Sequence, residues 1–241
     1  MAEDGGSPAR GGTRGKRRVM DTVRAWIVDG QLAPGQRLVE ADLAETLDVT
    51  RASVRAALLE LTAEGLLERV PNRGARVRVV SVEEAVQITE CRMALEGLCA
   101  AKAATNATNA QIAQARRLTA EMAAAVGAGE LLRYSDLNHE LHGLIRRMSG
   151  QAVADGILER LNAQLIRHRF QLSLRSGRVQ ESLPQHLAIV EAIARRDPVA
   201  AESAARAHLA SVVAALAAGT PAEGGDRHPI TTEPSRQGGG R

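Results

Sequence analysis

The pattern of hydrophobic positions changes character near residue 80. Before that point, apolar residues come in short runs separated by turn-forming residues such as Pro34 and Gly35. From Ser81 to Gly219 they recur every three or four positions, which is the spacing of helices that bury one face. We therefore predict a mainly α protein with two parts, a small N-terminal domain and a larger helical domain.

The first predicted helix begins at Lys16 and ends at Gly30, a residue type that commonly terminates helices. Its apolar face consists of Val19, Val23, Trp26 and Ile27. Residues 1–15 and 219–241 are rich in Gly, Pro, Thr and Arg and contain little to bury. We expect both segments to be disordered, and the first of them to be a basic tail.

Two further helices and a hairpin follow within residues 16–79. A short helix runs from Glu40 to Leu47, and Thr50 is a suitable N-cap for a second helix that ends near Ala63. The runs LLERV and ARVRVV then flank the turn PNRG and read as two strands. This order of elements predicts a winged helix-turn-helix.

The second of these helices has the side chains of a DNA-reading element. Arg51, Ser53 and Arg55 lie beside an apolar run, and arginine and serine are residue types that contact base edges in the major groove. Arg73 and Gly74 in the hairpin suit close approach to phosphate or to the minor groove. An ordinary helical hairpin with solvated arginines is the alternative, but it does not explain why these elements occur together.

The run PGQRLVEADLAETLDVTRASVRAALLELTAEGLL resembles the DNA-binding domain of GntR-family transcription regulators. The resemblance extends over residues 16–79, with Ser53 where the family usually has Pro and Ala56 where it often has Glu. It implies that the following residues lie at DNA: Thr50, Arg51, Ser53, Arg55 and Gly74.

The helical domain is predicted to cover residues 81–218. Ser81 and Glu84 have the spacing of a capping box, and Pro198 suits the first turn of the last helix. We predict six helices, at most seven, in an antiparallel bundle. The fourth is expected over roughly residues 152–175.

Four polar residues of this domain have the chemistry of metal ligands. Asn138 and His142 are four residues apart and share one helix face, and His186 and His208 lie on two later helices. If they converge, these imidazoles and the amide oxygen would form a divalent-metal site. The alternative is that each histidine is an ordinary core residue, because sequence alone cannot show convergence. His139 follows Asn138 directly and is expected on another side of the helix.

The segments RMALE, NHELHGLIRRMSG and QHLAIVEAIARRDPVAAESAARAHL resemble the FCD effector-binding domain of the FadR subgroup. The resemblance implies that Asn138 and the three histidines bind a metal, most often zinc or nickel, whose shell a small carboxylate effector completes. Asn in place of Asp at position 138 lowers the charge of the site by one. Arg92 could face the same cavity and bind the effector, or it could pair with Glu96 four residues on.

These features lead us to expect a DNA-binding transcription regulator whose operator affinity is controlled by a small carboxylate. By resemblance we expect a repressor that acts as a homodimer on operator DNA with two-fold symmetry. A metalloenzyme with a three-histidine site is an alternative, although no obvious general base accompanies the ligands. A metal sensor, in which the ion itself is the signal, is the other.

Composition adds little to this interpretation. The formal net charge is only +3 for 241 residues, so charge alone is weak support for DNA binding. Aromatic residues make up 1 % of the chain, and a core of Ala and Leu favours helices over sheets. With no secretory signal and no apolar run of the length that spans a membrane, we expect a cytoplasmic protein without a membrane partner.

Overall fold

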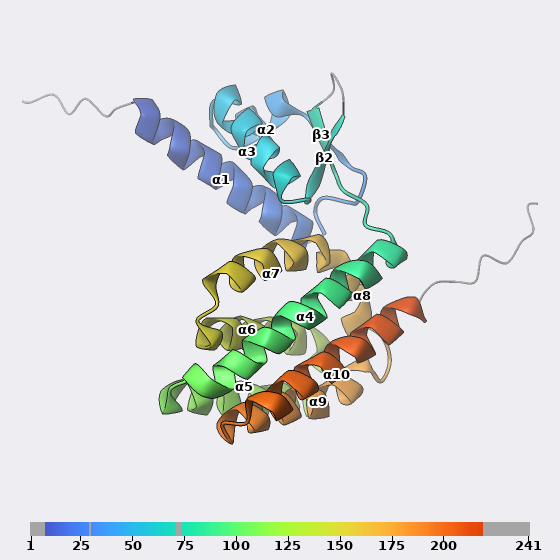
Figure 1. The fold of residues 1–241 in the computed structure, drawn as a ribbon. Coiled ribbons are helices and arrows are strands. Elements are labelled where there is room, and N and C mark those ends of the chain that lie inside the picture. Colours follow the sequence, from blue (N-terminus) through green and yellow to red (C-terminus); the bar gives the residue numbers. More distant parts are fainter. Residues whose placement is uncertain (1–7, 29, 71–73, 219–241) are drawn as a thin grey trace, which may run out of the picture.

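The structure is a computed structural model that describes residues 8–28, 30–70 and 74–218. Figure 1 shows a small domain of three helices and a sheet on one side of a helical bundle. The elements of the small domain are α1 (Pro8–Val28), β1 (Arg37–Leu38), α2 (Glu40–Thr46), α3 (Arg51–Ala63), β2 (Leu67–Val70) and β3 (Gly74–Val77). Those of the bundle are α4 (Val82–Asn106), α5 (Asn109–Ala128), α6 (Leu131–Ser149), α7 (Ala152–Gln164), α8 (Ile166–Ser173), α9 (Arg178–Ala194) and α10 (Pro198–Ala217). The predicted fold class, a winged helix-turn-helix joined to a helical bundle, is confirmed.

The sheet of the small domain has one strand more than the sequence predicted. β3 lies between β1 and β2 and is antiparallel to both, so the order is β1-β3-β2. β1 is only two residues long, which is too short to give a periodic signal in the sequence. Its Leu38 is buried in the core together with Val54 and Leu61 of α3.

The helix α1 begins at Pro8, eight residues before the predicted start at Lys16. The expectation of a disordered segment is therefore corrected for residues 8–15, while residues 1–7 lie outside the described part of the chain. Gly15 serves close packing, because a Cβ there would lie 2.9 Å from Ser53 Oγ on α3. The Ser53 hydroxyl also donates to Gly12 O at 3.3 Å.

The bundle contains seven helices among the described residues, the upper limit of the prediction. The predicted fourth helix divides at Leu165 into α7 and α8. The capping residues act as expected: Ser81 Oγ accepts from Glu84 N, and Pro198 occupies the first turn of α10. The segment 219–241, predicted to be disordered, lies outside the described residues.

Helix α10 is the one helix among the described residues that is long and apolar enough to be considered as a membrane span. By length and composition it passes as a spanning helix, with a mean hydropathy of 1.2 over its apolar window. Its buried residues, however, belong to the bundle core, where Ala201 and Ala205 pack with residues of α4 and α9. We interpret α10 as a core helix of the bundle.

The junction between α7 and α8 connects the two domains (Figure 1). Gln164 Nε2 donates to Glu64 O at the end of α3 at 3.2 Å. Arg78 Nη1, after β3, donates to Gln164 Oε1 at 3.1 Å. Ile166 packs against the hydrophobic core of the small domain. The start of α8 is therefore part of the interface with the DNA-binding domain.

Candidate metal centre and DNA-reading helix

Three imidazoles from three helices meet inside the bundle. His142 of α6, His186 of α9 and His208 of α10 each offer a ring nitrogen, and these atoms lie within 4.8 Å of one another. The Nε2 atoms of His142 and His186 are 3.2 Å apart. The structure thus brings together the three histidines that the sequence-based hypothesis requires.

A buried carboxylate holds the outer nitrogen of His142. Glu96 Oε2 lies 2.8 Å from His142 Nδ1, and Glu96 Oε1 accepts two hydrogen bonds from Arg92 at 2.8 and 3.0 Å. Burial raises the pKa of Glu96, but the charge of Arg92 and the hydrogen bonds from His142 and Arg92 outweigh it and hold the pKa well below its usual value. An ionised carboxylate can only accept, so Nδ1 of His142 donates and its Nε2 is free to bind a metal.

The Nδ1 atoms of the other two histidines also have hydrogen-bond partners. His208 Nδ1 lies 2.9 Å from Gln185 Oε1, which also accepts from a serine hydroxyl. His186 Nδ1 lies 3.2 Å from the hydroxyl of Tyr134. Partners of this kind fix the orientation of the ring and are typical of metal-binding histidines.

The protonation state of the inner histidines suits a metal. Burial lowers the pKa of His186 and of His208 well below its usual value. Nearby imidazoles lower both further, that of His142 for His186 and that of His186 for His208. Both rings are therefore neutral at physiological pH, and a neutral imidazole is the form that coordinates metal.

Asn138 lines the same cavity as His142 and His208, one turn before His142 on α6. Its Oδ1 atom is buried and has no hydrogen-bond partner among the described residues. A buried amide oxygen without a partner is costly, and a cation in the cavity would satisfy it. Three neutral imidazoles and one amide oxygen are a donor set that fits a divalent metal such as zinc or nickel.

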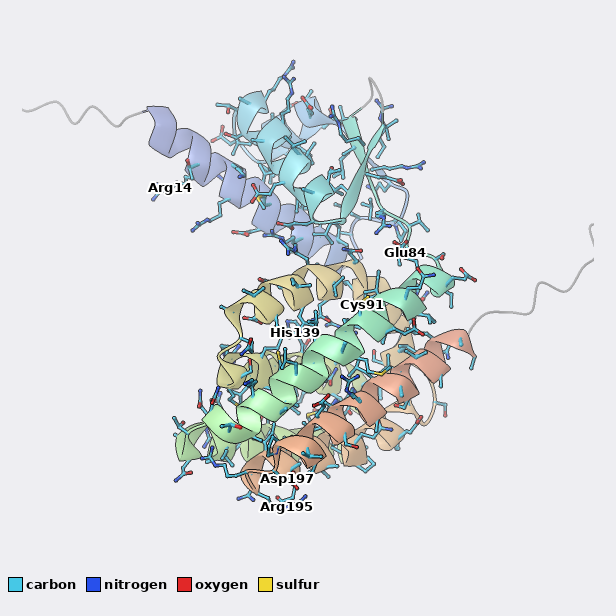
Figure 2. All side chains as sticks on the ribbon, viewed as in Figure 1. Arg14, Glu84, Cys91, His139, Arg195 and Asp197 are labelled. Atoms are coloured by element: carbon cyan, nitrogen blue, oxygen red, sulfur yellow. The ribbon has the colours of Figure 1, made fainter. Side chains whose placement is uncertain are left out.

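The cavity beside these ligands has a volume of about 80 Å³ and a basic wall. It is lined by four arginines, from four different helices: Arg92, Arg146, Arg169 and Arg178. His139 also lines it, although the sequence placed that residue on another side of α6; Figure 2 labels it within the helical domain. Arg92 lines the cavity and pairs with Glu96, while its contact with an effector stays a prediction.

Sequence reasoning missed the residues that support this site. They are Glu96, Tyr134, Gln185, Arg169 and Arg178. Each lies on a helix face that periodicity predicts to be inward or at the boundary, but no spacing relates one helix to another. Only the segment RMALE indicated one of these contacts beforehand, because its Arg92 and Glu96 are one helical turn apart.

Helix α3, predicted to be the DNA-reading element, presents two arginines to solvent. Arg51 and Arg55 are exposed, and Arg55 pairs with Glu40 of α2 at 3.0 Å. Thr50 is exposed and caps the helix by accepting from Ser53 N. The side chain of Ser53 turns toward α1, and only 5 % of the residue is exposed. The contact of Ser53 with DNA stays a prediction, and the burial of its side chain argues against it.

Gly74 has a structural role at the start of β3. Its φ is +89°, a left-handed conformation that favours glycine, and a Cβ there would lie 2.7 Å from Leu38 O. The glycine therefore allows β1 and β3 to approach each other. Arg73, predicted to contact DNA, lies outside the described residues.

A winged helix-turn-helix with exposed arginines, joined to a helical domain with an internal site, defines the class of DNA-binding transcription regulators. Residues 16–77 match the family described as bacterial regulatory proteins, gntR family, and residues 87–211 match the FCD domain. The chain belongs to the GntR family of bacterial transcription regulators and carries the FCD domain of its FadR-like members.

The chain is similar to proteins named as transcription regulators. The transcriptional repressor RspR of Escherichia coli is 28 % identical over 196 residues, covering 81 % of this chain and 86 % of that protein. The Nta operon transcriptional regulator of Aminobacter aminovorans is 32 % identical over 165 residues, covering 68 % and 76 %. The solved structure of E. coli McbR/YncC shares the fold with a TM-score of 0.72 at 21 % identity, covering 85 % of this chain and 97 % of that one.

Proposed function

We propose that this protein is a repressor that binds a two-fold symmetric operator as a homodimer and is controlled by a small carboxylate bound at a divalent metal. The observation that carries the proposal is the triad of histidines whose outer nitrogens are held by Glu96 and Gln185 and whose inner nitrogens face one another. An ordinary apolar core has no need for oriented imidazoles of this kind, because buried polar groups are costly unless they are hydrogen-bonded or bind a ligand.

DNA binding is assigned to the exposed start of α3. Arg51 and Arg55 each have a guanidinium that can donate two hydrogen bonds to guanine or to a phosphate. Arg55 is held by Glu40, an exposed pair that DNA phosphate can replace at little cost. One small domain reads one half-site, so a homodimer is required for a palindromic operator.

The metal is assigned to Asn138, His142, His186 and His208. The ion would supply a Lewis acid with open positions that bind carboxylate oxygens. The four protein ligands carry no charge, so the ion retains its full positive charge for an anionic effector. Arg92 adds a guanidinium to the same cavity, although it also serves Glu96.

Helix α8 provides a physical route from the cavity to the DNA-binding domain. Arg169 and Leu172 of α8 line the cavity. The adjacent His168 has its Nε2 2.9 Å from Val80 O, in the segment that joins β3 to α4. An effector that shifts α8 would therefore act on the linker and on Gln164, which contacts the end of α3.

The size of the expected response follows from typical coupling energies. Allosteric coupling of about 1–3 kcal/mol changes operator affinity about 5- to 150-fold. The hydrogen bonds of Gln164 at the end of α7 and of His168 on α8 are consistent with this range. A neutral hydrogen bond contributes about 0.5–1.5 kcal/mol, and one with a charged donor contributes more.

The DNA assignment is tested with the region upstream of the protein's own gene. In a fluorescence anisotropy titration we expect Arg51→Ala combined with Arg55→Ala to weaken binding at least about 10-fold, since each arginine supplies a charge-assisted contact. The matched control is Arg117→Ala, because Arg117 is also exposed but lies on α5 in the helical domain. Wild-type affinity in the double variant would refute the assignment of α3 as the reading helix.

The metal and effector assignments are tested on the purified protein. Elemental analysis should find about one divalent ion per chain, lost in His142→Ala and in His186→Ala. Carboxylates such as succinate and butyrate should release the metal-loaded protein from its operator fragment. Release by zinc or nickel alone, with no effect of any acid, would identify a metal sensor instead. The metalloenzyme alternative is set aside because the family and the relatives are transcription regulators.

A further inference from the structure

The basic wall of the cavity is more strongly charged than a single carboxylate needs. Four guanidinium groups line the cavity, and no Asp or Glu side chain lines it within the described part of the chain. Three of these arginines pair with carboxylates that do not line the cavity. The pairs are Arg92 with Glu96, Arg146 with Asp155, and Arg178 with Glu181.

Arg169 differs from the other three arginines. No ion pair or hydrogen bond involves its side chain among the described residues, although the residue is half-buried. Burial, followed by the charge of Arg92, lowers the pKa of Arg169, which places it in a region of positive potential. The carboxylates of Glu96 and Asp136 act in the opposite direction, but neither forms an ion pair with Arg169. A guanidinium stays protonated at neutral pH, so this charge lines the cavity without a paired carboxylate among the described residues. An uncompensated, partly buried charge is costly unless a ligand neutralises it.

The metal ligands leave a second positive charge uncompensated. Asn138 stands where the family pattern allows Asp, so the ligand set of one amide and three imidazoles brings no carboxylate to the ion. A divalent ion at these ligands and the guanidinium of Arg169 would therefore face one small cavity from two sides. One carboxylate cannot neutralise both.

We propose that the effector is a small dicarboxylate: one carboxylate binds at the metal, and Arg169 on α8 holds the other in a bidentate pair. This inference rests on the proposed function of the site and adds the class of ligand and the residue that selects it. The second carboxylate also explains how binding reaches the DNA-binding domain. Arg169 is the neighbour of His168, whose ring contacts Val80 O in the linker. A ligand that stops at the metal would lack this contact with α8.

The selectivity is tested by calorimetry on zinc-loaded full-length protein. The dicarboxylates oxalate, malonate, succinate and glutarate are compared with the monocarboxylates of the same carbon number, acetate, propionate, butyrate and valerate. At least one dicarboxylate should bind at least about 10-fold more tightly than its partner, which is about 1.4 kcal/mol. Arg169→Gln should reduce that ratio to about 2-fold by weakening the dicarboxylate alone.

Two control variants make this test specific. Arg160→Gln, an exposed residue of α7, should keep the wild-type ratio. Arg169→Lys keeps the charge without the bidentate geometry and should give an intermediate ratio. Far-ultraviolet circular dichroism and operator binding confirm that each variant is folded.

The inference is overturned if every dicarboxylate binds no more tightly than its partner, or if Arg169→Gln leaves the ratio unchanged. The proposed function has a separate readout. If monocarboxylates and dicarboxylates bind alike and both release the operator, the dicarboxylate inference fails and the proposed function stands. If the ratio behaves as expected but no acid changes operator affinity, the regulatory role fails and the ligand assignment stands.

Discussion

Replacing Glu96 by Gln tests whether the metal ligands are held by a buried carboxylate. The substitution keeps the size of the side chain and removes its charge. Only 9 % of the Arg92 side chain and 6 % of the Glu96 side chain are exposed, so Arg92 would be left as a buried charge without its partner. Breaking a buried ion pair in this way costs about 3–5 kcal/mol.

The chain contains a matched control at the same sequence spacing. Glu202 and Arg206 also pair at i, i+4, but their side chains are 41 % and 46 % exposed. Exposed helical pairs of this kind contribute about 0.3–0.5 kcal/mol. Chemical denaturation of metal-free protein should therefore separate Glu96→Gln from Glu202→Gln by about 3 kcal/mol or more.

Two further measurements identify the mechanism. Because the pKa of Glu96 lies below its unfolded value, its contribution is complete above about pH 4.5 and is lost as the pH falls further, so the two variants should converge in acid. The affinity for zinc should fall about 10- to 100-fold, as for other outer partners of metal-binding histidines. A loss of stability no larger than that of Glu202→Gln, with unchanged zinc affinity, would refute the reasoning.

Three other predictions follow from the structure. Gly74→Ala should destabilise the protein by about 1–3 kcal/mol in thermal unfolding, because its Cβ would meet a backbone oxygen of β1 at 2.7 Å in a left-handed conformation; the idea fails if the melting temperature is unchanged. Metal-free protein should lose stability as the pH falls from 7 to 5, because buried His186 and His208 stay neutral while their unfolded counterparts, with a pKa near 6.5, take up protons; a flat pH profile of the melting temperature would contradict this. Ser53→Ala should leave operator affinity within about 2-fold, whereas Arg51→Ala should weaken it at least about 10-fold, because only the arginine is exposed; equal losses in anisotropy titrations would support Ser53 as a base contact.

In the small domain, some features could be predicted from residues close together in the sequence and others could not. The turn and the cap at Thr50 could be predicted because their signals lie within a few residues of one another. The burial of Ser53 could not, because it depends on Gly12 and Gly15 of α1. Glycine weakens an isolated helix, so this segment reads as disordered until the close contact that needs glycine is known.

For the candidate metal centre, too, the sequence predicts positions within one helix but not contacts between helices. Helical periodicity predicts that His142 and Asn138 share a face, and the family resemblance adds His186 and His208. The rotation of one helix against another decides whether they meet, and packing of whole helices sets that rotation. Arg169 could not be placed at the cavity from the sequence either, because it lies on α8, and the sequence predicted α7 and α8 as one continuous helix.

The two hydrogen bonds that Gln164 makes between the domains require one orientation of its side-chain amide. Its nitrogen faces a carbonyl, Glu64 O, while its oxygen faces the guanidinium of Arg78. Rotating the amide by half a turn would place two acceptors together and two donors together, so both bonds form in one orientation and neither forms in the other. Gly65 leaves room for the amide, since a Cβ there would lie 2.8 Å from its nitrogen. The contact is therefore specific for one orientation of the amide, and its two hydrogen bonds are gained or lost together when the amide rotates.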